Sequence, residues 1–246
     1  MTGQTSTVSA SPTSRRAELA ELTGGRPILV VAPHPDDESL GCGGLLAAAF
    51  AGDGARVICM TDGAASHPRS RQWPADRLAR VRRGELLLAL KHLGGQPSDL
   101  SWFGLPDSAL CLLDEPRLQD VAERLAETAA RIGARHVFTP SPEDHHEDHR
   151  ATTRLVDRVW RADPALRLFH YPVWSRWDDR KMRSDPGDPW IRFPSAPSRN
   201  RKAMAIGAHG SQLGRVVTDD PTGFTLAPDF VRFFVDEDEL FREVPR

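Results

Sequence analysis

Short apolar runs alternate with longer amphipathic segments along most of this chain. The apolar runs cover residues 27–32, 56–61, 99–104 and 135–139. Unbroken runs of this length are typical of strands that are buried on both faces of a parallel sheet. Helices are expected between them, over residues 40–51, 75–93 and 116–132. This alternation predicts an α/β fold, Rossmann-like, with a mostly parallel sheet and helices on both of its faces.

The remaining segments follow other patterns. Residues 1–16 contain almost no large apolar side chain and predict a disordered tail, which leaves a single domain over residues 17–246. Residues 178–200 are dense in Pro, Arg, Asp and Ser and lack periodicity, so we expect a long lid or specificity loop there. Beyond it we expect a helix over residues 201–212 and a late strand over residues 231–235.

Composition and charge narrow the class of protein. The chain has 246 residues, and its 34 acidic and 32 basic residues give a net charge of −2. This balance excludes a strongly basic nucleic-acid binder. No apolar run approaches the roughly 18 residues of a membrane span, and residues 1–16 lack the apolar segment of a signal peptide. We therefore expect a small-molecule partner, with no nucleic acid and no membrane, and a homo-oligomer is compatible with these features.

Cysteine usage points to a compartment. Cys42, Cys59 and Cys111 are odd in number, lie far apart and form no CxxC pair. The absence of a disulfide framework is typical of proteins in a reducing environment. We therefore expect a cytoplasmic location and interpret the three thiols as small buried hydrophobic groups.

Two clusters of polar residues follow predicted strands. Residues 33–38 (PHPDDE) come directly after the first strand, and residues 143–149 (EDHHEDH) come shortly after the fourth. Ligands of open parallel sheets bind outside the carboxyl ends of the strands. We therefore expect both clusters on one rim of the sheet.

The spacing within the clusters favours a metal site. His34 and Asp37 lie three residues apart across a strand-to-helix turn, and His149 is a candidate third ligand. Two imidazoles and one carboxylate with an open fourth position are typical of catalytic rather than structural zinc sites. Asp36, beside Asp37, would point elsewhere and stay anionic as a base. His146 and His149 are also three apart, so that one would bind metal while the other faces substrate.

Simpler explanations compete with each cluster taken alone. A His-Pro-Asp sequence after a strand is commonly an ordinary turn, and a run of His, Asp and Glu is commonly a solvated loop or a helix N-terminus with acidic capping. In a metal site, by contrast, Asp148 could orient one of the imidazoles. The occurrence of both clusters at strand ends of one α/β chain favours the metal site.

Three closely spaced glycines offer a different motif. Gly41, Gly43 and Gly44 open the predicted helix over residues 40–51, as a nucleotide-binding loop would. Their spacing does not match GxGxxG. Close helix–strand packing is the better explanation of these glycines.

These residues resemble a known family. Residues 30–38 (VVAPHPDDE) are similar to the first signature of the zinc-dependent LmbE-like/PIG-L de-N-acetylases, which act on N-acetylglucosaminyl conjugates. Residues 146–149 (HEDH) are similar to the later HxDH signature of that family. Weaker matches at residues 61–63 (TDG) and 105–107 (LPD) help to extend the resemblance from about residue 27 to residue 213.

The resemblance implies a metal centre and a base. His34, Asp37 and His149 would bind the metal, which is Zn²⁺ by family preference, although the ligand set also suits Fe²⁺. Asp36 would be the general base that accepts a proton from water. His146 would stabilise the oxyanion or protonate the leaving amine.

The resemblance also implies supporting and substrate-binding residues. Asp148 would support His146 in catalysis. Arg82 and Asp107 occupy positions that contact the amino-sugar substrate in some members, and His209 matches a further substrate contact. Some members carry a Tyr two residues before the HxDH signature to polarise the carbonyl, whereas this chain has Asp144 there. Another residue, or the metal with His146 alone, must then polarise the carbonyl.

The helix over residues 75–93 supports a special role for Arg82. At 100° per residue, Arg82 and Glu85 fall inside its apolar arc, where unpaired charges are costly. Either the two form a buried ion pair, or Arg82 reaches the rim and Glu85 orients it, and neither reading excludes the other. Of the weaker candidates, His67 is interpreted as a solvated loop residue, and Trp174 as a core residue or a platform for a sugar or acyl chain.

The favoured function is a zinc-dependent deacetylase, an amide hydrolase that releases acetate and a free amine from an N-acetylated sugar conjugate. Two alternatives stay open: a metal-dependent phosphoesterase, and a non-catalytic carbohydrate-binding module on the same fold. A phosphoesterase of the two-metal kind needs a second metal site, for which the chain offers few spare carboxylates. A binding module has no chemical need for Asp36.

Overall fold

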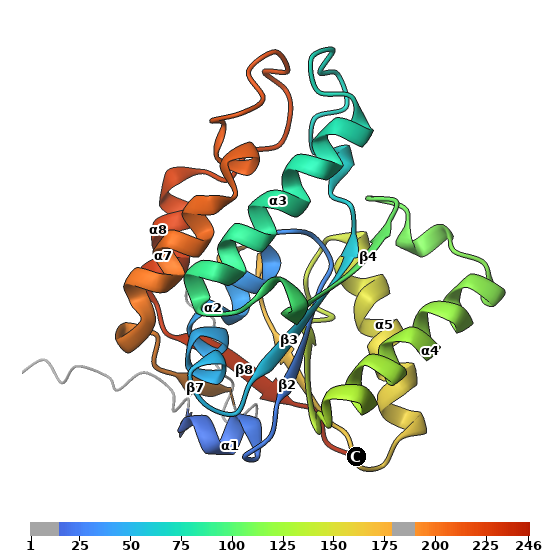
Figure 1. Cartoon of the computed structure of the whole chain (residues 1–246), viewed down its shortest axis with the longest axis vertical. Coiled ribbons are helices and arrows are strands. Elements are labelled where there is room, and N and C mark those ends of the chain that lie inside the picture. The colour runs from blue at the N-terminus through green and yellow to red at the C-terminus, as the bar shows by residue number, and fades with distance from the viewer. Residues whose placement is uncertain (1–14, 179–189) are drawn as a thin grey trace, which may run out of the picture.

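The fold is built on one sheet, which the computed structural model describes together with its helices over residues 15–178 and 190–246. The strands are β1 (Arg15–Arg16), β2 (Ile28–Ala32), β3 (Ala55–Thr61), β4 (Leu100–Leu105), β5 (His136–Pro140), β6 (Arg167–Tyr171), β7 (Ile191–Phe193) and β8 (Glu239–Glu243). They lie in the order β1-β7-β8-β6-β5-β2-β3-β4 (Figure 1). β8 runs antiparallel to its neighbours β6 and β7, and the other pairs are parallel. The mostly parallel α/β sheet expected from the sequence is confirmed.

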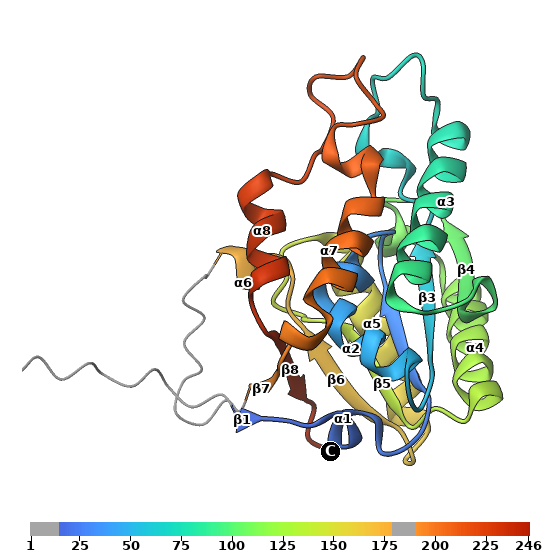
Figure 2. The ribbon, with the colours of Figure 1, turned by 60° about the vertical axis from the view of Figure 1, so that its left-hand side comes forward.

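Helices cover both faces of the sheet (Figures 1 and 2). The α-helices are α1 (Leu19–Thr23), α2 (Asp37–Phe50), α3 (Ala75–Leu93), α4 (Glu115–Ile132), α5 (Glu147–Ala162), α6 (Trp174–Asp178), α7 (Arg199–Ala208) and α8 (Pro228–Asp236). One core packs α2, α3, α7 and α8 against the sheet, and a second core packs α4 and α5 against the other face. β2 serves both, since Val30 points into the first core and Leu29 and Val31 into the second. This two-sided burial explains its unbroken apolar sequence.

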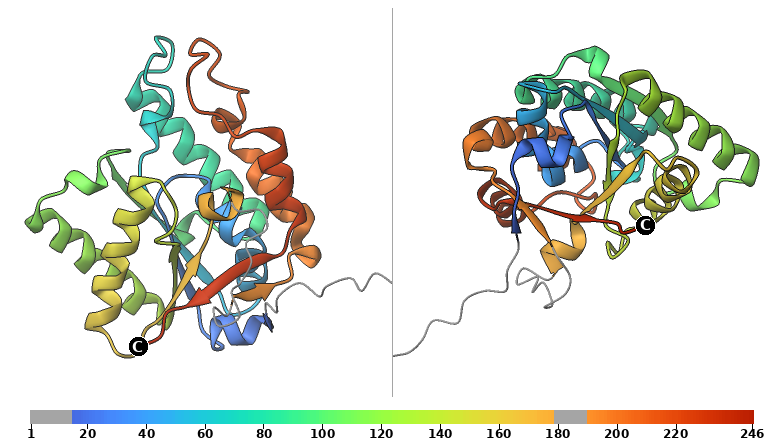
Figure 3. Two further views of the ribbon diagram at one scale, coloured as in Figure 1. Left: turned by 180° about the vertical axis from the view of Figure 1, so that it is seen from behind. Right: turned by 90° about the horizontal axis from the view of Figure 1, so that it is seen from below.

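The connections change direction between β2 and β5. The crossovers through α2 and α3 carry the chain from β2 to β3 and β4 over the first core, and those through α4 and α5 carry it from β4 to β5 and β6 over the second. β2 and β5 are therefore neighbours whose following helices leave to opposite faces, as the view from behind also shows (Figure 3). Such a switch point opens a crevice outside the carboxyl ends of the strands.

The glycines of α2 allow other elements to approach closely. A Cβ added at Gly41 would lie 2.3 Å from the Tyr171 ring, and one added at Gly43 would lie 2.9 Å from the Lys202 side chain. Both distances are shorter than real Cβ contacts, so α2 packs in this position only with glycine. The packing interpretation of the glycine cluster is confirmed.

The C-terminal part corrects two predicted boundaries. Residues 231–235 lie inside α8 and not in a strand. The β-forming side chains favoured a strand, but Pro228 occupies the first helical turn, and Phe230 and Phe234 are buried four residues apart on one helical face. The helix expected over residues 201–212 is α7, which ends at Ala208 and is followed by the 3₁₀-helix η5 (Gly210–Leu213).

The segments expected to be irregular are partly ordered. Residues 1–14 of the predicted tail and residues 179–189 of the predicted loop lie outside the described residues. The described remainder includes β1, whose Arg15 and Arg16 pair with Ile191 and Arg192 of β7. Ends of both predicted irregular segments therefore form strands together.

The helices within residues 15–178 and 190–246 do not combine the length and the apolar character that a membrane span requires.

Candidate active site

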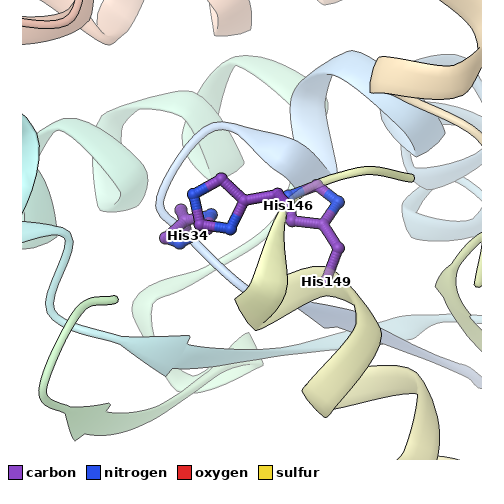
Figure 4. A group of neighbouring side chains, drawn as sticks. All are labelled: His34, His146 and His149. Atoms are coloured by element: carbon purple, nitrogen blue, oxygen red, sulfur yellow. The ribbon is translucent and has the colours of Figure 1, made fainter. Parts of the chain in front are cut away.

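The carboxyl ends of β2 and β5 bring the two polar clusters together. His34 lies in the β2–α2 loop, and Asp37 is the first residue of α2. His146 is the N-cap of α5, and His149 lies in the first turn of that helix. Figure 4 shows the three imidazoles next to one another, with ring centroids 4.6–5.5 Å apart. Both clusters therefore share one rim of the sheet, as the topology predicts.

Two imidazoles converge on one carboxylate oxygen. Nδ1 of His34 and Nε2 of His149 each lie 3.2 Å from Oδ2 of Asp37. The His149 side chain is fully buried, yet its Nε2 makes no hydrogen bond of acceptable geometry to the described residues. A buried nitrogen that points at a carboxylate without a hydrogen bond is what a divalent cation shared by the two groups would satisfy. The donor set of two imidazoles and one carboxylate suits Zn²⁺ and several related ions.

Carboxylates hold the outer nitrogens of both rings. Nδ1 of His149 lies 2.9 Å from Oδ2 of Asp144, and Nε2 of His34 lies 3.3 Å from Oδ2 of Asp148. Such contacts fix the orientation and tautomer of a metal-binding histidine. They leave Nδ1 of His34 and Nε2 of His149 as the atoms available to a metal.

The role of Asp144 was not foreseen from the sequence, which marked this position only as a departure from the family pattern. Its fully buried carboxylate accepts hydrogen bonds from the backbone N–H of Val173 at 3.2 Å and of Ser175 at 2.9 Å, besides its contact with His149. Asp144 therefore ties the first turn of α5 to the segment after β6. The only signal in the sequence was an acid five residues before a candidate ligand histidine.

Asp148 acts on two histidines in different ways. Its carboxylate contacts His34, whereas its backbone N–H donates to Nδ1 of His146 at 3.2 Å. The same carboxylate accepts from the backbone N–H groups of Ser108 at 2.7 Å and Leu110 at 3.1 Å. The support that the resemblance assigned to the Asp148 side chain thus reaches His34, and His146 is supported by the backbone.

A second group of candidate ligands surrounds the outer nitrogen of His34. Its Nε2 lies 3.2 Å from Oδ1 of Asp107 and near Asp148, and the three ligand atoms lie within 4.8 Å of one another. Burial alone would raise the pKa of Asp107, but the hydrogen bond to His34 holds this pKa below its usual range. Both oxygens of Asp148 already accept a backbone N–H. Asp107 and Asp148 are therefore explained as carboxylates that orient His34, and not as ligands of a second metal site.

Asp36 has a backbone conformation that is unusual for aspartate. Its φ is 145° and its ψ −30°, and its backbone N–H donates to the carboxylate of Glu38 at 3.0 Å. Burial raises the pKa of Asp36 to about 7, the neighbouring Asp37 adds to the increase, and the nearby Arg82 opposes it. A carboxylate with a pKa near neutrality is suited to accept a proton at physiological pH.

Arg82 of α3 determines where the Asp36 carboxylate lies. Its guanidinium donates to Oδ2 of Asp36 at 3.1 Å, to the carbonyl of Pro35 at 2.7 Å and to the carbonyl of Gly63 at 2.7 Å. Glu85 accepts from the backbone and hydroxyl of Ser211, so the ion pair considered between Arg82 and Glu85 is not the observed arrangement. Arg82 instead reaches the rim and holds the β2–α2 loop.

His146 faces the cavity as a neutral side chain. Burial and the neighbouring His34 and His149 lower its pKa to about 4. Its Nδ1 accepts the backbone N–H of Asp148, so the neutral ring carries its proton on Nε2. His146 can therefore donate a hydrogen bond from Nε2 at neutral pH.

His209 lies behind the cavity. It is fully buried, and its Nε2 lies 3.2 Å from Oε1 of Glu38. It does not belong to the cavity lining, whereas Arg82 and Asp107 do. The substrate contact expected of His209 therefore has no direct path in this arrangement.

The candidate residues open onto a cavity of about 220 Å³. Its lining consists of His34, Asp36, Asp37, Leu40, Ala65, Ser66, Arg82, Asp107, Ser108, His146, Trp174, Gln212, Phe224 and Leu226. A larger hollow of about 450 Å³ lies between α4 and α5, but none of the candidate residues reaches it. Candidate catalytic and metal-binding residues, among them Asp36 and His34, therefore line the smaller cavity and not the larger one.

The fold and the site together define an α/β protein with a candidate metal centre at the switch point of its sheet. Residues 29–160, more than half of the chain, match the PIG-L family, described as GlcNAc-PI de-N-acetylase, and the chain belongs to this family.

Known relatives and structures agree with this assignment. The chain is 32% identical to 1D-myo-inositol 2-acetamido-2-deoxy-alpha-D-glucopyranoside deacetylase of Kineococcus radiotolerans over 57% of this chain and 47% of that protein, so it spans about half the length of this relative. N,N'-diacetylchitobiose deacetylase from Pyrococcus horikoshii shares the fold at a TM-score of 0.64 and 21% identity, over 93% of this chain and 87% of that one. GalB, the 4-carboxy-2-hydroxymuconate hydratase of Pseudomonas putida, also shares it at a TM-score of 0.65 and 15% identity, over 90% and 97%. The fold alone therefore does not decide the reaction.

Proposed function

We propose that this protein is a metal-dependent deacetylase that hydrolyses the N-acetyl group of a glucosamine conjugate. The observation that carries the proposal is the pair of imidazole nitrogens, from His34 and His149, that lie 3.2 Å from one oxygen of Asp37 beside a cavity that also contains Asp36. Membership of the de-N-acetylase family and a relative named for removing an acetyl group from an amino sugar support the same reaction.

His34, Asp37 and His149 would hold the metal, which we propose to be Zn²⁺. When bound, the ion would polarise the amide carbonyl and make water a stronger acid. Asp144 and Asp148 keep the two imidazoles in the ligating orientation, and His34, Asp37 and His149 are the one ligand set that we propose among the described residues. We therefore propose one metal per chain, which separates this reaction from that of a two-metal phosphoesterase.

Asp36 is proposed to accept the proton of the attacking water. Arg82 holds its carboxylate at 3.1 Å, and the carboxylate faces the same cavity as Asp37. As the water oxygen bonds to the carbonyl carbon, its proton passes to Asp36. As the C–N bond breaks, Asp36 passes this proton to the leaving nitrogen, which releases a free amine and acetic acid, and the acid ionises to acetate.

His146 is proposed to stabilise the charge that develops on the carbonyl oxygen. Its neutral imidazole donates from Nε2, and a hydrogen-bond donor aimed at this charge acts mainly in the transition state. No Tyr is required at position 144 for this purpose, because His146 provides a donor from the same helix terminus.

The substrate-binding assignments differ in strength. Asp107 lines the cavity, and we propose that it accepts a hydrogen bond from a sugar hydroxyl. Arg82 also lines it, although its guanidinium already serves Asp36, Pro35 and Gly63, so we propose that it acts mainly by positioning Asp36.

A cytoplasmic location is part of the proposal. Cys42 and Cys59 are buried thiols as expected, whereas Cys111 is exposed, so its interpretation as a buried group is wrong. An exposed thiol persists most readily in a reducing compartment, which supports this location.

The reaction is tested by measuring the release of free amine from N-acetylglucosamine glycosides. We expect turnover by the metal-loaded protein, loss of turnover after chelation, and recovery when Zn²⁺ is returned. Release of phosphate from sugar phosphates without release of amine would contradict the proposal and favour the phosphoesterase alternative.

A further inference from the structure

The cavity lining combines polar and apolar residues. Asp36, Asp37, Arg82 and Asp107 are among the polar ones, whereas Trp174, Phe224, Leu226 and Leu40 contribute apolar surface and are here called the wall. Acetyl hydrolysis requires only a small apolar contact for one methyl group. The extent of the apolar surface is therefore not explained by the chemistry of the amide.

Phe224 is exposed at the cavity mouth. Its side chain lines the cavity, and the residue remains 41% exposed, unlike the buried Leu226 two positions later. Apolar area left in water costs roughly 25 cal/mol per Å² relative to burial. An exposed aromatic ring beside a reactive centre indicates a surface that a ligand covers.

The segment that carries Phe224 is held firmly in place. We name residues 214–227 the C-terminal loop and residues 62–74 the N-terminal loop, and the two stand side by side at one end of the molecule (Figures 1 and 2). Asp219 accepts from the hydroxyl of Ser70 at 2.6 Å, and Asp220 accepts from the backbone N–H of Arg69 at 2.9 Å. The backbone N–H of Phe224 itself donates to the carbonyl of Ser66 at 2.7 Å. The position of Phe224 is thus fixed by the opposite loop.

A glycine completes this anchorage. A Cβ added at Gly223 would lie 2.1 Å from the imidazole of His67, so the C-terminal loop packs directly on that ring. His67 is accordingly only 3% exposed, and its interpretation as a solvated residue is wrong. Gly223 and His67 together fix the backbone from which the next residue, Phe224, projects.

Trp174 is a second fixed ring of the wall. Its ring centroid lies 5.8 Å from that of Phe224 and 5.1 Å from that of Phe230, which is buried in the first core. The following residue, Ser175, is tied to Asp144 through its backbone N–H. The wall is therefore connected to the same carboxylate that orients His149.

We propose that Trp174, Phe224 and Leu226 form a subsite for an apolar substituent of the substrate, an alkyl or aryl group attached to the N-acylated amino sugar. This inference rests on the proposed deacetylase function and adds the chemical class of the substituent. Preformed apolar surface next to polar reactive groups discriminates by hydrophobic burial, at little ordering cost.

The substituent has two points of attachment, the acyl group and the glycosidic oxygen, and two substrate series distinguish them. The first compares methyl and butyl glycosides of N-acetylglucosamine, and the second compares N-acetyl and N-pentanoyl methyl glucosaminides. Each pair differs by three methylene groups. We expect kcat/KM to rise roughly threefold per methylene in the series that reaches the wall, which is roughly 30-fold in all.

The variant Phe224→Ser removes the exposed ring of the wall. We expect the ratio of kcat/KM between the long and short members of the responsive series to fall roughly five- to tenfold in this variant. Because the ratio is taken within one preparation, loss of folded or active protein cancels. The matched control is Met204→Ser, since Met204 is an exposed apolar residue on α7 outside the cavity lining, and it should keep the wild-type ratio.

The outcomes of the two series distinguish the two attachment points from each other and from the absence of an apolar subsite. A gain only in the glycoside series assigns the wall to the aglycone, and a gain only in the acyl series assigns it to the acyl chain. Flat or falling kcat/KM in both series, with the short substrates still turned over, overturns the subsite and leaves the deacetylase function standing.

A binding measurement tests the subsite without any reaction. Octyl β-D-glucoside, kept below its micelle concentration, and methyl β-D-glucoside carry no amide and are compared by calorimetry. We expect the octyl compound to bind at least tenfold more tightly than the methyl compound and to lose most of this advantage in Phe224→Ser. Such binding without amine release from any substrate would retain the apolar subsite and reject the deacetylase, whereas equal binding of both glucosides would overturn the subsite itself.

Discussion

Asp36 is held by its backbone and by Arg82 in a conformation that aspartate does not adopt freely. Its φ of 145° belongs to a region that is sparsely populated by residues other than glycine, and such outliers cost of order 1–3 kcal/mol. Three hydrogen bonds from Arg82 to this loop and to Gly63 oppose that cost. The strain places the carboxylate of Asp36 in the cavity while Asp37 faces the two imidazoles.

Asp36→Asn tests the separation of base from ligand. The amide cannot accept the proton of water, so we expect kcat to fall roughly 10²–10⁴-fold. The metal content should stay at the wild-type level, because Asp36 is not among the proposed ligands. Elemental analysis and amine release measured on the same preparation check both parts, and full turnover by the variant would refute the assignment of Asp36.

Asp144→Asn tests the orientation of His149. The substitution keeps the shape of the side chain but removes the charge that faces Nδ1, and loss of such an outer partner typically weakens metal binding roughly 10–100-fold. Competition with a chelator measures this affinity. The control is Glu147→Gln, the same chemical change at an exposed acid in the first turn of α5, which should bind metal as the wild type does. Equal affinities in both variants would show that Asp144 has no such role.

At the scale of residues, the sequence predicted which residues form the candidate site better than it predicted which residues they contact. Topology was enough to place His34, Asp37 and His149 together, because both clusters follow strands whose carboxyl ends lie at one rim. The partner of Asp148 could not be predicted in this way, since its contact with His34 depends on how α5 meets the β4–α4 segment. The same holds for Asp144, whose partners come from the chain after β6.

Between elements, a single buried ion pair joins three parts of the fold. Nζ of Lys202 on α7 donates to Oε1 of Glu239 at the start of β8 at 2.7 Å, and both side chains are fully buried. Glu239 also accepts from the backbone N–H of Gly44 at 2.6 Å and of Leu45 at 2.8 Å in α2. The pair thus links α2, α7 and β8 on the face of the sheet that supports the cavity.

Lys202→Met tests this link. It leaves the Glu239 charge buried without its cation, so we expect the free energy of unfolding to fall by about 3–5 kcal/mol. Adding Glu239→Gln removes the charge and keeps one acceptor oxygen, which serves one of the two backbone N–H groups, so the double variant should regain part of the loss. Urea unfolding measures both, with Lys91→Met on the exposed side of α3 as the control. A single variant as stable as the control would contradict the role of the pair.

At the scale of elements, periodicity predicted the central part of the fold well. The helix expected over residues 75–93 is α3 with the same bounds, and the four predicted strands are β2 to β5 within one or two residues. α8 was missed because its Phe and Val residues favour strands, whereas burial of Phe230 and Phe234 selects a helix. β7 was missed because a strand of three residues, Ile191–Phe193, is too short to show alternation.

At the scale of the whole molecule, the candidate site lies where the connections between strands change from one face of the sheet to the other. β2 and β5 are adjacent in the sheet but are followed by helices on opposite faces, so the loops after them diverge and leave room for a cavity. His34, Asp36 and Asp37 follow β2 at the start of α2, and His146 and His149 follow β5 at the start of α5. Neither segment alone contains the proposed base, the neutral donor and the full set of proposed ligands.

The central claim, that these two loops build one metal centre, is tested most directly by the metal content of the purified chain and of His34→Ala. The account predicts about one Zn²⁺ or Fe²⁺ per wild-type chain and a loss of that metal in His34→Ala, with the variant still folded by circular dichroism. A wild-type chain that holds no metal, and gains none when Zn²⁺ is added, would contradict the account.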